Sequence, residues 1–493
     1  MGCGNDDPDD NESKSTSDVA SSDDTASVGD VADAPGAPAA PAPMYLEATW
    51  TGAWAPSKIV RLNRKPSRRG FVDLRGIIHA HSPYSHDACD GEPFDKDGNI
   101  NKPCWEDFRR DFCTVGHDFV FLSDHPVHFR KHEFPDVLLY DKARGDKLVM
   151  HDGKHAGNWI DCSGRKQLIM AGSESAQSMP IGLPGHVGDV EQRKKLYSTK
   201  DKATFEALQK HGAVVLYAHT EGRSISDLVD LPVQGFEMFN LHANMMGKLN
   251  NALGVAAEIL DDDNQPKPSA DLVFLPLVWE DPAYLTRWGT VMARGKKRVT
   301  VMGTDCHRNT LPIKLHDDER VDSYRRMMTW FSNHLLVKPG TDGTWDDRDL
   351  KDALTARRVY GVFEFLGFPE GFDFTATQVD GDGKAQLYEM GAEVSLAKGK
   401  TWLHVRMPSI IRVDPKAPKA KLVARILRAK EGGWDEVARV EDGDIALQVS
   451  KSGAYRTEIR MQPFHLEPHL GFWKAKAKRD LVWIYSNVVY VTD

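Results

Sequence analysis

The chain has no long hydrophobic run and no concentration of basic residues, although it is 493 residues long. No apolar stretch reaches the length of about 20 residues that a membrane-spanning helix needs. Lys and Arg number 63 against 72 Asp and Glu, which leaves a formal net charge of -9. The basic residues form no stripe, so binding to nucleic acid is not expected.

Cysteine is also scarce, with six residues and no CxxC pair. A cysteine-based zinc site is therefore not indicated. Cys89 and Cys104 flank a polar loop rich in Asp, Gly and Asn. Either they form a disulfide in an oxidising compartment or they are buried free thiols, and the sequence leaves both readings open.

Large apolar residues are almost absent from the first 43 residues, which carry much of the negative charge. Such a segment buries too little surface to offset its chain entropy, and we expect residues 1–43 to be a disordered tether. The start Met1-Gly2-Cys3-Gly4 resembles that of a mature bacterial lipoprotein, in which Cys3 would carry the lipid. The resemblance implies a lipid-anchored, extracytoplasmic envelope protein that meets the membrane only through that lipid, although the expected signal region is missing from the sequence. The alternatives are N-myristoylation at Gly2 and a plain cytoplasmic tail.

Short apolar runs recur through residues 44–368, and many end in a histidine or a carboxylate. Runs of this kind are typical of strands that are buried on both faces. Helix-like segments lie between them, and this alternation predicts a parallel sheet or barrel of the α/β class. The polar segments 126–168 and 175–200 are interpreted as long loops that line a site. The expected helices are Trp105–Val115, Lys202–His211, Met245–Leu260, Asp281–Arg294, Ser323–Leu335 and Trp345–Ala356.

Residues 369–493 have a different pattern, in which polar and apolar residues alternate between turns rich in Gly, Pro and Asp. Half-buried strands of this length and spacing predict a separate antiparallel β-sandwich domain. The candidate strands are 392–396, 401–406, 421–426, 455–460 and 487–491.

The strand ends carry side chains that are suited to binding metal ions. His79 and His81 lie two residues apart, so both project from the same face of a strand, as do Asp305 and His307. At the end of another apolar run, His125 is a candidate ligand that Asp124 would orient. The other candidates are Asp87, Glu174, His186 and His219. Nine such groups would be costly to bury unpaired, and cations are the simplest compensation.

These residues form an ordered set of motifs. They are HxHSxYSxD at His79–Asp87, DxxxxSDH at Asp118–His125, GxE at Gly172–Glu174, Gly185-His186, the strand-end His219 and GTDxH at Gly303–His307. The set resembles the polymerase and histidinol phosphatase (PHP) superfamily of metal-dependent hydrolases over roughly residues 70 to 315. One departure is Thr220, where the family commonly has proline after the strand-end histidine.

The resemblance implies a distorted (β/α)7 barrel with a site for up to three divalent ions of zinc, manganese or iron. The first ion would be held by His79, His81, Glu174 and Asp305, the second by Glu174, His186 and His219, and the third by Asp87, His125 and His307.

The implied activity is hydrolysis of a small-molecule ester, either a phosphodiester or a phosphomonoester, by a hydroxide that bridges two metal ions. Glu174, Asp305 and His219 would act at the reacting centre. Arg308, Arg223 and Lys314 are candidates for neutralising the charge of the substrate. Within the superfamily, the motifs are most similar to those of a branch that includes secreted phosphoesterases and carbaryl-type carbamate hydrolases. A carbamate or amide hydrolase is therefore one alternative. A non-catalytic surface binding protein is another.

Overall fold

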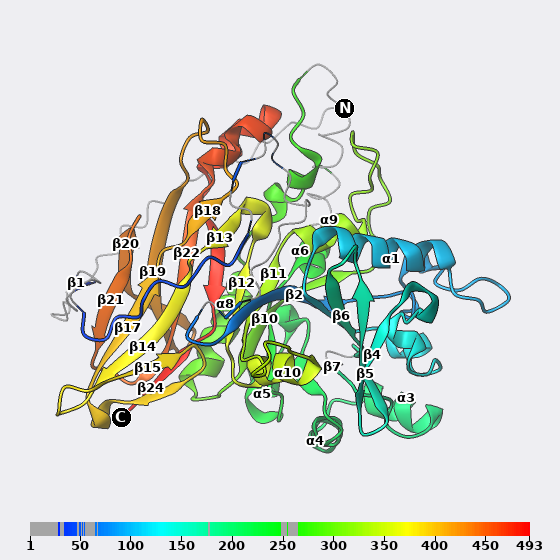
Figure 1. Ribbon diagram of the computed structural model, residues 1–493, viewed down its shortest axis with the longest axis horizontal. Coiled ribbons are helices and arrows are strands. Elements are labelled where there is room, and N and C mark those ends of the chain that lie inside the picture. The colour runs from blue at the N-terminus through cyan, green and yellow to red at the C-terminus, as the bar shows by residue number, and fades with distance from the viewer. Residues whose placement is uncertain are drawn as a thin grey trace, which may run out of the picture.

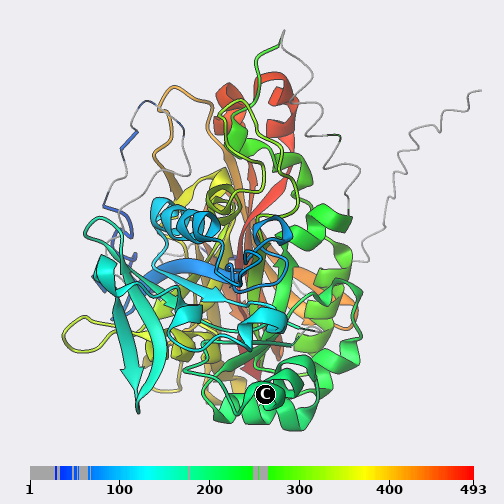
Figure 2. The ribbon, with the colours of Figure 1, turned by 90° about the vertical axis from the view of Figure 1, so that its right-hand side faces the viewer.

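The computed structural model describes residues 28–29, 34–46, 49–50, 52, 54, 65–66, 68–175, 178–247, 254 and 265–493. It is a mixed α/β structure with one large sheet and further antiparallel sheets. In Figure 1, the strands of the C-terminal part lie on the left together with β1, whereas α1, β4, β5, β6 and α3 lie on the right. The view in Figure 2, from the right-hand side, places the blue-to-green half in front of the yellow-to-red strands.

The helices occur mainly in the first three quarters of the chain, whereas strands occur throughout. The α-helices are α1 Lys102–Val115, α2 Pro126–Phe129, α3 Val190–Ser198, α4 Lys202–Lys210, α5 Ile225–Asp230, α6 Leu241–Gly247, α8 Pro282–Ala293, α9 Tyr324–Thr329 and α10 Asp347–Thr355. The strands up to the predicted domain boundary are β1 Val28–Gly29, β2 Val72–Ala80, β3 Phe119–Leu122, β4 Lys147–His151, β5 Lys154–Asp161, β6 Lys166–Met170, β7 Ser178–Ile181, β8 Val214–Tyr217, β9 Gly235–Asn240, β10 Val299–Cys306, β11 Ser332–Val337 and β12 Val359–Val362. Beyond it, or across it, are β13 Phe368–Glu370, β14 Asp373–Val379, β15 Ala385–Glu389, β16 Glu393–Ser395, β17 Lys400–Arg406, β18 Ser409–Ile411, β19 Lys421–Lys430, β20 Gly433–Glu441, β21 Ile445–Val449, β22 Gly453–Gln462, β23 Leu481–Ser486 and β24 Val489–Thr492.

Six strands run parallel in the order β8, β9, β10, β2, β3, β6. All nine residues of β2 are buried. Its successive side chains enter two different apolar cores, with Ile77 in one and Ile78 in the other. Strand β3 behaves in the same way, with Val120 and Phe121 in opposite cores. The apolar runs are therefore strands buried on both faces, as predicted.

Local capping residues define where the helices begin and end. Helix α1 begins at Asn101, whose side chain accepts a hydrogen bond from the Cys104 N–H, and ends at Gly116 in the left-handed conformation. Helix α10 begins with a capping box in which Asp346 and Asp349 bond to each other's backbone N–H groups.

Several sequence predictions of secondary structure are corrected. The supposed loop 126–168 contains the antiparallel hairpin β4–β5, which extends the sheet beyond β6. The supposed loop 175–200 contains β7 and α3. Of the helix predicted over Ser323–Leu335, only Tyr324–Thr329 is helical, because β11 begins at Ser332 and pairs with β2. Most of the helix predicted over Met245–Leu260 falls outside the described residues.

The strands after residue 368 are antiparallel except for the β16–β24 pair. β18 pairs with β13 in a two-stranded sheet, and the other strands form two groups. One is a five-stranded sheet in the order β1, β21, β17, β14, β15. The other comprises β19, β20, β22, β23, β24 and β16, and joins the large sheet because β23 pairs with β12. Hydrogen bonds between strands therefore cross the predicted boundary between residues 44–368 and 369–493. A sandwich of two layers stays a prediction.

Part of the predicted tether packs against this five-stranded sheet. Val28 and Gly29 pair with Leu447 and Ala446 at its edge. Further along, the Gly36 carbonyl accepts a hydrogen bond from the Thr377 hydroxyl at 3.0 Å. Parts of the described segment 28–43 therefore contact the sheet, and the tether over residues 1–43 stays a prediction. Cys3 and the remainder of the tether lie outside the described residues.

Two disulfides hold helix α1. Cys89 is bonded to Cys104, one of the two alternatives left open above, and Cys113 is bonded to Cys162, a pair that the sequence analysis did not predict. Cys306 is buried and is the one free cysteine in the described part of the chain. None of the helices described here is long and apolar enough to traverse a bilayer.

Candidate metal centre

All but one of the residues predicted as ligands lie at or just beyond the carboxyl ends of the parallel strands. His79 and His81 stand at the end of β2, His125 follows β3, His219 follows β8, and Asp305 is the penultimate residue of β10. Parallel strands bring their carboxyl ends to one edge of a sheet, so ligands from distant parts of the sequence meet there. Three overlapping groups of predicted ligands have donor atoms within 4.8 Å of one another: His81, Asp87, His125 and His307; His79, His81 and Asp305; and His79, Glu174 and His219.

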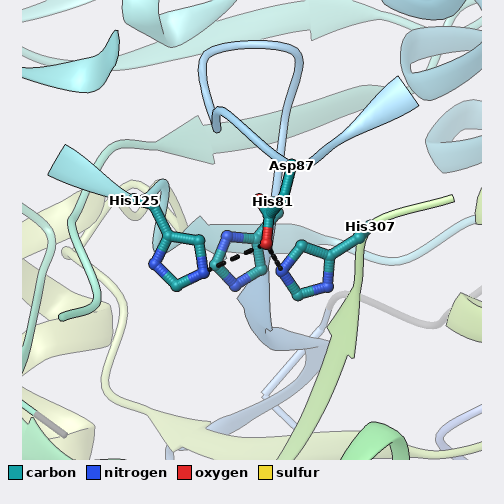
Figure 3. Close-up of side chains that lie close together, drawn as sticks. All are labelled: His81, Asp87, His125 and His307. Atoms are coloured by element: carbon teal, nitrogen blue, oxygen red, sulfur yellow. Dashed lines mark ion pairs between the residues drawn. The ribbon is translucent and has the colours of Figure 1, made fainter. Parts of the chain in front are cut away.

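The first group surrounds the Asp87 carboxylate (Figure 3). Asp87 Oδ2 lies 3.4 Å from His125 Nε2 and 3.3 Å from His307 Nε2, and His81 lies between the two rings. The rings of His81 and His307 are stacked with centroids 3.8 Å apart. His307 Nε2 is buried and has no hydrogen bond of acceptable geometry in the described chain. A buried nitrogen that faces a carboxylate without a well-formed hydrogen bond fits a shared ligand position for a cation.

The second group centres on Asp305. Its Oδ1 lies 3.1 Å from His79 Nε2 and 3.1 Å from His81 Nε2. Between the pairs Gly303–Ile78 and Cys306–Ala80, β10 has two residues where β2 has one, so the strands form a bulge at this place. His79 and Asp305 both have positive φ, 68° and 56°, a conformation that costs non-glycine residues about 1–3 kcal/mol each. The bulge turns both side chains toward the shared site.

Glu174 links two of the groups. Its Oε2 lies 3.1 Å from His125 Nδ1, and it also belongs to the group with His79 and His219. His219 approaches Asp305 from the other side, with Nε2 3.4 Å from Oδ2. Glu174 thus lies between His125 on one side and His79 and His219 on the other, and its role as a ligand shared by two ions stays a prediction.

His186 is the predicted ligand that the structure does not bring to the cluster. Its Nδ1 lies 3.0 Å from the Tyr197 hydroxyl and its Nε2 lies 2.8 Å from the His132 carbonyl oxygen. The ring packs against Phe129 and Phe134. Both nitrogens have partners away from the other ligands, because the segment after β7 folds onto α3 and not over the strand ends.

Two further predicted roles are corrected. Arg308 directs its guanidinium to Asp107 of α1, 3.2 Å away, and not to the histidines. Asp124 does not orient His125, because its carboxylate accepts hydrogen bonds from the backbone and hydroxyl of Ser82 at 2.6 and 2.7 Å. Of the other cationic candidates, Arg223 lies beside the centre, where its Nε donates to the His219 carbonyl oxygen at 3.4 Å.

The sequence analysis missed three residues that contact the ligands. Glu237, in the middle of β9, is fully buried and accepts hydrogen bonds from His79 Nδ1 at 2.5 Å and from the His219 N–H at 2.9 Å. Glu221 lies 3.2 Å from His219 Nδ1. His242, in the first turn of α6, lies 3.2 Å from Asp305 Oδ2. A carboxylate inside the apolar run Phe236–Phe239 was the available signal for Glu237.

The charges of the cluster are strongly coupled. Burial acts to lower the pKa of His79, but the carboxylates of Glu237 and Asp305 outweigh it and raise that pKa well above its usual value. By contrast, burial lowers the pKa of His307 to about 4, with neighbouring histidines adding to the effect. Burial would raise the pKa of Asp305, yet the surrounding histidines hold it well below its usual value. The Asp305 carboxylate thus stays anionic among positively charged or polar partners.

No family model, curated protein or solved structure matches this chain. The interpretation of these side chains as a candidate metal centre therefore rests on their own chemistry and geometry. Imidazole and carboxylate donors suit zinc, manganese and iron. The buried His307 Nε2, which makes no hydrogen bond of acceptable geometry, and the grouped donor atoms fit such ions. Several groups of His, Asp and Glu side chains in this structure can hold a metal ion.

Proposed function

We propose that the chain is a metal-dependent hydrolase of the PHP type that acts on a small phosphoester. The observation that carries the proposal is the convergence of eight of the nine predicted ligands in three overlapping groups with donor atoms within 4.8 Å. These residues come from five separate strand ends, and a site of this kind is the usual place for chemistry in parallel α/β folds.

The same proposal includes the distorted (β/α)7 barrel. Two observations support it: six consecutive parallel strands, and backbone hydrogen bonds between the segment after β6 and the region of β7. In these bonds the Ser173 N–H donates to the Pro180 carbonyl at 3.0 Å, and the Leu183 N–H donates to the Ala171 carbonyl at 2.8 Å. β7 in turn pairs with β8 at the far end of the parallel series.

Bound divalent ions would supply Lewis acidity and lower the pKa of a coordinated water. The chain's own residues set up the site for this. Glu174 and Asp305 each contact two sets of imidazoles and hold them at fixed spacing. Glu237 and Glu221 bind the Nδ1 atoms of His79 and His219, which leaves the Nε2 atoms directed to the centre. Arg223, next to His219, is the cationic side chain placed to offset negative charge on a substrate.

The proposal extends to location. Two disulfides favour an oxidising compartment, which agrees with an extracytoplasmic envelope protein. Lipid attachment at Cys3 belongs to the same proposal.

Activity is tested on the full chain after removal of metal and reconstitution with zinc or manganese. The substrates are a nitrophenyl phosphodiester, a nitrophenyl phosphomonoester and an aryl carbamate. Metal-dependent release of nitrophenol from a phosphoester supports the proposal, and cleavage of the carbamate alone would replace it by the carbamate hydrolase. A metal-replete protein that cleaves none of the three would favour a binding protein.

A further inference from the structure

His242 occupies the rim of the centre although no motif pointed to it. It lies two residues beyond the end of β9, with Nδ1 3.2 Å from Asp305 Oδ2 and its ring centroid 5.3 Å from that of His307. Donor atoms of His242, Asp305 and His307 lie within 4.8 Å of one another. The side chain is 22% exposed, so it faces the open side of the cluster.

A chain of hydrogen bonds sets the orientation of this imidazole. Asn309 Nδ2 donates to the Asp87 carbonyl at 2.7 Å, which turns Asn309 Oδ1 toward Thr310. The Thr310 hydroxyl donates to that Oδ1 at 3.0 Å. The same hydroxyl lies 3.2 Å from His242 Nε2, within hydrogen-bond distance, and so holds the ring with Nδ1 toward Asp305.

The other nitrogen faces the Asp305 carboxylate. His242 Nδ1 lies 3.2 Å from Asp305 Oδ2, and donor atoms of His242, Asp305 and His307 lie within 4.8 Å of one another, a spacing that suits ligands of one cation. Asp305 Oδ1 faces His79 and His81, whereas its Oδ2 faces His219 and His242. One carboxylate thus lies between two pairs of imidazoles.

His186 has the opposite environment. Both its nitrogens are bonded, to Tyr197 and to the His132 backbone, and aromatic rings surround it. We propose that His242, and not His186, completes the metal centre, with Nδ1 and Asp305 Oδ2 as ligands of one divalent cation and Thr310 as the residue that positions the ring. This inference rests on the proposed function, because it presumes that the centre binds metal.

The test compares His242→Gln with His186→Gln in the full chain. Each protein is stripped with a chelator and titrated with Zn²⁺ alone. Bound zinc is measured by inductively coupled plasma mass spectrometry, and the dissociation constants by competition with a chromophoric chelator. His242→Gln is expected to hold one equivalent fewer than the wild type or to bind its weakest ion at least about tenfold less tightly. His186→Gln is expected to bind zinc as the wild type does.

The proposal is overturned if His242→Gln binds zinc like the wild type, or if His186→Gln loses an equivalent. Should His242→Gln not fold, Thr310→Val gives the answer, because it removes only the hydroxyl that contacts His242 Nε2 and keeps the backbone bond from the Thr310 N–H to Asp322. It should weaken zinc binding several-fold, and unchanged affinity would refute the role of His242. A wild-type protein that binds no zinc would instead refute the proposed function as a whole.

Discussion

Loss of each of the two disulfides should affect stability and metal binding differently. The disulfide whose loss costs more unfolding free energy should be the one that matters less for metal binding. Cys89–Cys104 closes a loop with a sequence separation of 15, and Cys113–Cys162 closes one of 49. If a disulfide acts by restricting the unfolded chain, the first contributes about 3 kcal/mol and the second about 4 kcal/mol. Loss of the longer loop should therefore cost more stability.

Metal binding should follow the reverse order, because only the first disulfide is next to the centre. Cys89 lies two residues beyond Asp87, and its N–H donates to the His307 carbonyl at 3.2 Å. On the other side, Tyr324 contacts both Cys104 Sγ and the His307 carbonyl. Cys162, by contrast, lies in the turn between β5 and β6, at the amino end of β6 and so away from the carboxyl strand ends where the ligands lie.

The assay uses the double variants Cys89→Ser/Cys104→Ser and Cys113→Ser/Cys162→Ser, which leave no unpaired partner thiol. Unfolding is followed by urea titration of the metal-free proteins, and zinc affinity by chelator competition. We expect the second variant to lose more unfolding free energy but to bind zinc normally. The first should lose less stability and bind zinc several-fold more weakly. If the variants differ in stability alone, or if the Cys113/Cys162 variant binds zinc less well, the coupling of Cys89 to Asp87 is wrong.

Three other predictions concern single residues. Glu174→Ala should abolish activity and lower metal content, and an active, metal-replete variant would exclude a shared ligand at this position. Glu237→Gln should reduce metal affinity about 10- to 100-fold without unfolding the chain, because it perturbs the carboxylate that orients His79. Unchanged zinc affinity would show that the contact with His79 has no role in metal binding. His465 is buried, and burial lowers its pKa to about 4. Below about pH 6.5 the unfolded chain therefore binds more protons than the folded chain, and the free energy of unfolding falls as the pH falls. Between pH 7 and pH 5 this residue should cost about 2 kcal/mol, and His465→Gln should reduce that pH dependence in urea titrations; an identical pH dependence in the variant would refute the assignment.

The parallel strands could be predicted because burial on both faces leaves a plain signal in the sequence. Phe119–Leu122 and Val214–Tyr217 are uninterrupted apolar runs, and both are strands in the structure. The β4–β5 hairpin had no such signal. Its first strand, Lys147–His151, has one buried residue, Val149, and reads as a polar loop.

The same reasoning explains the outcome at the metal centre. Ligands at strand ends, such as His81 and Asp305, are placed by the sheet, so their positions follow once the strands are known. His186 lies in a connecting segment, and its place depends on contacts with Phe129, Phe134 and Tyr197 that no local pattern reveals. Glu237 was missed because it lies within a strand, where Gly303 of the neighbouring strand leaves the space that its carboxylate occupies beside His79.

The most direct test of the account is the metal content of the purified full chain, measured by inductively coupled plasma mass spectrometry. The account predicts two to three equivalents of zinc, manganese or iron per chain, bound as purified or after reconstitution. A protein that folds and yet retains no metal after reconstitution would contradict it, and the grouped histidines and carboxylates would then require another explanation.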